Sequence, residues 1–155
     1  PLTHQPSYPL TFFLYLCKMG RIIGIDFGLR RIGIAVTDPL KMFAQPLTTI
    51  YATDFPDWLK IYSVQEQIDE FVVGMPSKLS GEDTDATQPV RDFIDWLKIN
   101  YPNIPIATID ERYSSHEAQM FINKSVVKKD QRKDKKLVDT ISAALILQTH
   151  LQRIS

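Results

Sequence analysis

Residues 24–36 constrain the fold of this chain more than any other segment, and they read Gly-Ile-Asp-Phe-Gly-Leu-Arg-Arg-Ile-Gly-Ile-Ala-Val. Two short runs rich in Ile and Val, residues 22–27 and 32–37, flank a turn that contains glycine. This pattern predicts two strands joined by a tight turn. Asp26 stands at the end of the first run. An ionised carboxylate among buried apolar groups is costly unless a partner or a metal compensates it. We therefore expect Asp26 to have a functional role.

The composition is that of a soluble globular protein. The 155 residues are 44% hydrophobic and 23% charged, which is enough apolar material for one domain with a real core. Lys plus Arg and Asp plus Glu each number 18, so any nucleic-acid binding would require local segregation of charge. The single cysteine, Cys17, excludes an internal disulfide framework and a cysteine-based zinc site. It fits a reducing cytosol, and we expect a cytoplasmic location.

The first 18 residues differ from the rest of the chain. They contain three prolines followed by an apolar run at 10–17. That run is shorter than the ~20 residues a membrane span needs, and it lacks the basic start of a signal peptide. We expect Met19 to be the natural start, with residues 1–18 a leader or tail outside a single domain at 19–155. An additional edge strand is the alternative, and no membrane partner is expected.

The remaining pattern predicts an α/β fold. Strands are expected at 22–27, 32–37, 43–51, 70–75 and 105–110, and helices at 54–68, from Thr87, at 114–123 and at 137–151. A polar loop at 76–86 and a charged link at 124–136 complete the order. Short connections make the first three strands an antiparallel meander, and the two later strands add in parallel. The prediction is a mixed five-stranded sheet flanked by helices, with Trp58 and Trp96 packing in the core.

Carboxylates fall where such a sheet gathers its chemistry. Asp110 and Glu111 close the fifth predicted strand, and Asp139 lies in the first turn of the last predicted helix. Strand ends and element starts are the usual functional positions of an open sheet. The neighbours of Asp139 at i+3, i+4 and i+7 are small or apolar, so we expect Asp139 to face the sheet. A favourable interaction with the helix dipole is the alternative.

If Asp26, Glu111 and Asp139 converge, these three carboxylates require a cation between them. Oxygen ligands suit Mg²⁺ or Mn²⁺, and such ions support phosphodiester hydrolysis. The residues alone therefore predict metal-dependent phosphoryl chemistry and no more specific reaction.

Four ordered motifs resemble the YqgF/RuvX family. They are residues 24–38, 73–77 with Gly81, 110–115 and 136–144, and the resemblance runs from about Met19 to the C-terminus. It implies an RNase H-like fold akin to the Holliday-junction resolvase RuvC. It also implies a cytoplasmic bacterial nuclease that matures the 5′ end of precursor 16S ribosomal RNA in ribosome biogenesis.

Carried over by position, the family's metal-binding catalytic set is Asp26, Glu111 and Asp139. RuvC-like resolvases often carry another acid one turn beyond the helix aspartate, where this chain has Ser142. The site is therefore poorer in charge, with Asp110 as a candidate substitute ligand.

Basic residues crowd into the segment that precedes Asp139, where a loop could lie over a phosphate backbone. A solvated linker is the alternative. Arg31 and Arg112 could contact phosphate or hold an acid in place. A structural salt bridge is the alternative for each. The predicted nucleic-acid contacts are Arg31, Arg112, Lys128, Lys129, Arg132, Lys133, Lys135 and Lys136. The expected partners are structured RNA or branched DNA, with ribosomal precursor particles implied by the resemblance.

Three alternative functions remain open. One is a Holliday-junction-resolvase-like DNA endonuclease, since nothing in the residues decides between RNA and DNA. Another is a non-catalytic ribosome-assembly or nucleic-acid-binding factor. The third is a nucleotide-binding module, because actin-like kinases also hold ATP phosphates with an Asp-x-Gly turn, although those proteins duplicate the fold and are much longer.

Overall fold

The computed structural model describes residues 19–76, 85–110 and 134–154. The elements in these ranges are β1 (Arg21–Phe27), β2 (Arg31–Thr37), β3 (Ala44–Tyr51), α2 (Phe55–Gln65), β4 (Ile68–Met75), α3 (Thr87–Asn100), β5 (Ile106–Asp110) and α5 (Lys135–Ile154). The strands form one sheet in the order β3-β2-β1-β4-β5. Strand β1 pairs antiparallel with β2 and parallel with β4, and β5 extends the parallel part. The predicted mixed sheet with a central first strand is confirmed.

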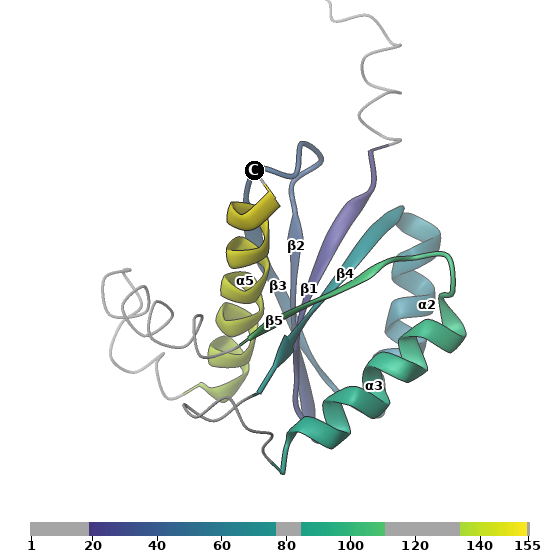
Figure 1. Ribbon diagram of the computed structural model, residues 1–155, viewed down its shortest axis with the longest axis vertical. Coiled ribbons are helices and arrows are strands. Elements are labelled where there is room, and N and C mark those ends of the chain that lie inside the picture. Colours follow the sequence, from purple (N-terminus) through teal and green to yellow (C-terminus); the bar gives the residue numbers. More distant parts are fainter. Residues whose placement is uncertain (1–18, 77–84, 111–133, 155) are drawn as a thin grey trace, which may run out of the picture.

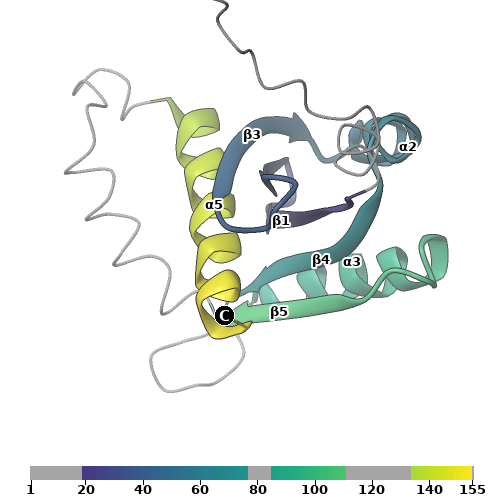
Figure 2. The same ribbon diagram turned by 90° about the horizontal axis from the view of Figure 1, so that it is seen from above.

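Helices cover both faces of the sheet. Helix α5 crosses one face, and α2 and α3 lie against the other (Figures 1 and 2). Side chains of β1 alternate between the two layers, as the pleat requires. Ile23 and Ile25 pack toward α2 and α3, whereas Ile22 packs beneath α5. Within the described ranges, none of the helices has the length and apolar character needed to cross a membrane.

Two glycines let α5 lie very close to the sheet. A Cβ atom added at Gly24 would come within 2.6 Å of Leu147 Cβ. A Cβ atom at Gly33 would overlap the carbonyl oxygen of Asp139. Any larger residue at these positions would therefore require the helix to move away from β1 and β2.

The start of α5 differs from the prediction. The helix begins at Lys135, so residues 135–136 are helical and do not belong to the charged link. The physical reason is a cap, because Asp134 Oδ1 accepts the backbone N–H of Lys136 at 2.9 Å.

Trp58 and Trp96 pack against the core, as predicted. The predicted helix at 114–123 and the leader at 1–18 lie outside the described residues.

The turn between β2 and β3 is held by one carboxylate. Asp38 accepts backbone N–H groups from Leu40, Met42 and Phe43 at 2.7–3.0 Å. Lys41 inside this turn adopts a left-handed backbone with φ of 57°. Burial alone would raise the pKa of Asp38, but these hydrogen bonds outweigh it and hold the pKa below its usual value.

We expect Asp38→Ala to lower the free energy of unfolding at pH 7 by about 1–2 kcal/mol, because three turn amides lose their acceptor. A carboxyl group whose pKa is lowered by folding stabilises the protein above its unfolded pKa, and that contribution disappears as the pH falls through the folded pKa. The difference from wild type should therefore shrink below about pH 4 in urea titrations. An exposed acid on α3 is the control, and Asp95→Ala should change stability by less than ~0.5 kcal/mol. A pH-independent loss in Asp38→Ala would contradict this account.

Candidate active site

Asp26 lies at the carboxyl end of the central strand. On β1 it follows Ile22 and Gly24 at two-residue spacing, and both of these face α5. Strand alternation therefore directs Asp26 to the α5 face of the sheet. The residue is half-buried. This is the position that the sequence predicted for it.

Asp139 lies beside Asp26 on the same face. Gly33 is directly opposite Asp26 in the antiparallel pair of β1 and β2. The Asp139 backbone rests on Gly33, since its carbonyl oxygen occupies the space of the missing Cβ. Opposed residues of an antiparallel pair have Cβ atoms roughly 5 Å apart. The close approach of α5 thus brings the backbone of a second acidic residue next to the end of β1.

The environment of Asp139 matches one prediction and corrects another. Its helix neighbours Ala143 and Ile146 are buried against the sheet, as predicted for that stripe. Because α5 begins at Lys135, however, Asp139 lies in the second turn and not in the first. The helix dipole acts mainly within the first turn. An interaction with the dipole therefore explains Asp139 less well than a role at the sheet.

Arg31 holds the carboxylate of Asp139. Its Nε donates to Asp139 Oδ2 at 2.8 Å across 108 residues of sequence. The side chains are 28% and 25% exposed, so the pair is neither dry nor fully solvated. The structure shows Arg31 in an ion pair with an acid, and its predicted contact with phosphate stays a prediction.

A pair of threonines fixes the start of α5 on β3. The hydroxyl groups of Thr49 and Thr140 lie 2.6 Å apart, and both donate to the carbonyl oxygen of Lys136. Lys136 Nζ also lies 5.4 Å from the centre of the Tyr51 ring. The sequence analysis did not identify Thr49 or Thr140. The only available signal was a pair of consecutive threonines, Thr48 and Thr49, in a predicted strand, and such a pair does not indicate which residue it contacts.

Of the two remaining predicted acids, the structure describes Asp110 but not Glu111. Asp110 ends β5 opposite Met75. Ile109 packs beneath α5, so alternation assigns Asp110 to the face opposite Asp26. That placement argues against a role as substitute ligand. Glu111 lies outside the described residues, as do Arg112, Lys128, Lys129, Arg132 and Lys133.

Two basic residues predicted to bind nucleic acid lie at the same end of the sheet as the acids. Lys135 and Lys136 are exposed in the first turn of α5. Tyr51, beneath Lys136, is opposite Arg31 in the pair of β2 and β3. Asp26, Asp139 and these cations therefore share one rim of the sheet.

The donor set suits a hard divalent ion. Within the described ranges no group of three or more His, Cys, Asp or Glu side chains is placed to hold a metal, and only two of the three predicted ligands belong to these ranges. Mg²⁺ commonly uses one or two protein carboxylates and completes its shell with water and substrate phosphate. Asp26 and Asp139 meet that requirement.

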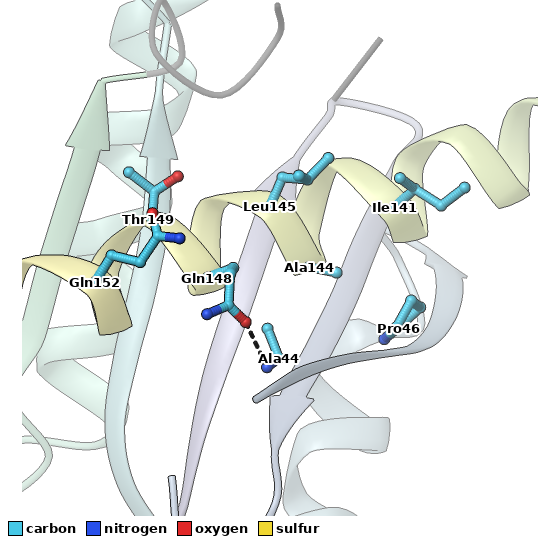
Figure 3. A pocket seen from close by; sticks show the side chains of 8 residues that line it. All are labelled: Ala44, Pro46, Ile141, Ala144, Leu145, Gln148, Thr149 and Gln152. Carbon is cyan, nitrogen blue, oxygen red and sulfur yellow. Dashed lines mark hydrogen bonds between the residues drawn. The ribbon is translucent and has the colours of Figure 1, made fainter. Parts of the chain in front are cut away.

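Two surface hollows lie apart from the acids. One of about 350 Å³ runs between α5 and the edge strand β3, where Gln148 Oε1 accepts the N–H of Ala44 at 3.0 Å (Figure 3). This side chain satisfies an amide of an otherwise open edge. The other hollow lies on the α2 and α3 side and is lined by aromatic side chains such as Phe27 and Trp96. Neither contains Asp26 or Asp139.

Comparison with known families identifies the relationship. A model of the RuvX family, described as Holliday junction resolvase, matches residues 20–153. The chain belongs to the RuvX family. The predicted resemblance is confirmed.

RuvX relatives are similar over most of the chain. One from Porphyromonas gingivalis is 41% identical over 133 residues, which is 86% of this chain and 96% of the relative. One from Amoebophilus asiaticus is also 41% identical and covers 86% of this chain and 94% of the relative. Both carry the name "putative pre-16S rRNA nuclease".

The fold is shared with a solved structure of RuvC. Thermus thermophilus RuvC in complex with a Holliday junction substrate superposes with a TM-score of 0.53 at 11% identity, over 86% of this chain and 96% of RuvC. At that identity the similarity shows the RNase H-like fold alone.

The RuvX site depends on the missing side chain of Gly33. We expect Gly33→Ala to move α5 away from β2 and to lower the free energy of unfolding by about 2–4 kcal/mol, because the new methyl group overlaps backbone and not a flexible side chain. Thermal and urea unfolding measure the loss. Ala35→Gly, on the same face of β2, is the control for strand propensity and should cost about 1 kcal/mol. Equal effects of the two changes would contradict the close seating of α5.

Proposed function

We propose that this RuvX-family chain is a divalent-metal-dependent nuclease that cleaves phosphodiester bonds of structured RNA, with the 5′ end of precursor 16S ribosomal RNA as its substrate. The observation that carries the proposal is the adjacency of Asp26 and Asp139 on one face of the sheet, through Gly33. The names of the relatives support the choice of RNA. The proposed setting is the cytoplasm, on ribosomal precursor particles.

In this proposal Asp26, Asp139 and Glu111 hold the ion, which is Mg²⁺ or Mn²⁺. When bound, it supplies an activated water and stabilises the leaving oxygen. The chain's own residues bring the ligands together. Gly33 lets Asp139 approach Asp26, and Arg31 fixes the Asp139 carboxylate. Both acids are half-buried, which limits the water that competes for the site.

Substrate binding is assigned to the cations at the same rim. Lys135 and Lys136 project from the first turn of α5 beside Asp139, and the basic residues from 128 to 133 precede them in sequence. Phosphate contacts of this kind position a nucleic acid without reading its sequence. The balanced overall charge is no obstacle, because Lys135 and Lys136 lie at the rim that carries Asp139.

Asp26→Asn and Asp139→Asn are expected to reduce Mn²⁺-dependent cleavage of a precursor 16S RNA fragment by at least about 100-fold, because each loses an anionic ligand. RNA binding in the presence of EDTA should persist, as measured by filter binding. Asp110→Asn is the matched control, since alternation assigns it to the other face, and it should retain activity within a few fold.

Other results would redirect the proposal. Cleavage that survives Asp26→Asn would exclude this site. Binding without cleavage in the wild type would favour the non-catalytic assembly factor. Preferential cleavage of a four-way DNA junction would favour the resolvase activity named in the family description.

Replacing both Lys135 and Lys136 with Gln should weaken RNA binding and make it less dependent on salt. Each lost phosphate contact lowers the slope of log K against log salt by about 0.7–0.9, so the double variant should lose ~1.5. Titrations between 50 and 300 mM KCl measure the slope. Lys98→Gln, an exposed cation on α3, should leave it unchanged. An unchanged slope in the double variant would remove these residues from the interface.

A further inference from the structure

The contact between Arg31 and Asp139 raises a question that the proposed function leaves open. If Asp139 binds a divalent ion, its Oδ2 is also the atom that receives the Arg31 Nε–H at 2.8 Å. A guanidinium and a divalent ion would therefore both bind one carboxylate. Both are cations, so they would repel one another while both interacting with this carboxylate.

We infer that Arg31 weakens ion binding at Asp139 until an RNA phosphate engages its guanidinium, so that ion and RNA bind cooperatively. The inference rests on the proposed function and adds a mechanism of regulation at the same site. Arg31 acts in it as a positioning residue that couples two ligands.

Two opposing influences of Arg31 decide the sign of the effect. A hydrogen bond from outside the coordination shell usually helps a metal ligand, because it fixes the orientation of that ligand. At this site the orientation has other sources. The Asp139 backbone is seated on Gly33, and the start of α5 is tied to β3 through Thr49. Removal of Arg31 therefore costs little positioning.

Repulsion between the guanidinium and the ion outweighs the loss of positioning. A unit charge about 6 Å from a divalent ion, even with the dielectric constant of water, changes the binding of that ion roughly tenfold. Arg31 stays within that range because β2 holds it near Gly33, which is opposite Asp26. The half-buried surroundings of the pair reduce screening further. The guanidinium therefore opposes the ion.

A phosphate removes this opposition. Guanidinium groups bind phosphate oxygens in a planar, charge-assisted geometry, and Arg31 lies at the rim that carries Lys135 and Lys136. Once paired with phosphate, Arg31 no longer repels the ion and no longer occupies Oδ2. Linkage then requires that the ion strengthen RNA binding by the same factor.

The test is calorimetric titration with Mn²⁺ alone and with Mn²⁺ in the presence of a cleavage-resistant phosphorothioate RNA oligonucleotide. Arg31→Gln should bind Mn²⁺ about tenfold more tightly than wild type without RNA. RNA should tighten Mn²⁺ binding at least about fivefold in wild type and less than about twofold in Arg31→Gln. Arg30→Gln is the matched control, because it removes an exposed arginine one residue away, and its affinity should stay within about twofold of wild type.

Arg31→Lys keeps the charge and loses the guanidinium, so its Mn²⁺ affinity should stay near that of wild type. Tightening in the Lys variant, or weaker or unchanged binding in Arg31→Gln, would overturn the inference while leaving the metal site in place. Absence of Mn²⁺ binding in wild type and in Arg31→Gln would overturn the proposed function and the inference together. Unfolding curves of each variant confirm that the compared proteins are folded.

Discussion

Helix α5 lies directly on β1 and β2 because Gly24 and Gly33 present no Cβ atom to it. This contact of backbone with backbone decides where Asp139 lies. The backbone of Asp139 is seated on Gly33, the residue opposite Asp26, and its carboxylate pairs with Arg31. The contact of Thr49 on β3 with Thr140 on α5 and the cap at Asp134 then fix the start of the helix. The geometry of the candidate site is thus set by main-chain packing, and the polar contacts refine it.

The stability of this arrangement comes from the apolar layer beneath α5. Ala143, Ile146 and Leu147 are nearly or fully buried there. Burial of a side chain as large as Ile or Leu contributes about 1.5–3 kcal/mol. The ion pair of Arg31 and Asp139 adds little, because a half-exposed pair loses to solvent much of what it gains. Its significance is local, since it offsets the charge of an acid that the fold has placed beside another acid.

The sequence predicted the features that depend on local pattern. Runs of Ile and Val located β1 and β2, and a charge at the end of the first run identified Asp26. The prediction from sequence was wrong at the start of α5. Lys135 and Lys136 continue a basic segment, so the sequence pattern does not indicate that Asp134 caps a helix there. It could not assign a partner to Arg31, since the contact with Asp139 spans 108 residues and leaves no local periodicity. Gly33 was one residue of the second predicted strand, and the pattern gave no sign that it admits a helix backbone. Glu111 remains a prediction.

The central claim is that Asp26 and Asp139 share one divalent ion at the carboxyl end of β1. Anomalous diffraction from crystals grown with Mn²⁺ tests it most directly, because the metal's own signal locates it independently of any assay. The account predicts an anomalous peak within ~2.3 Å of a carboxylate oxygen from each of these two residues. A peak that touches neither residue, or only one of them, would contradict it.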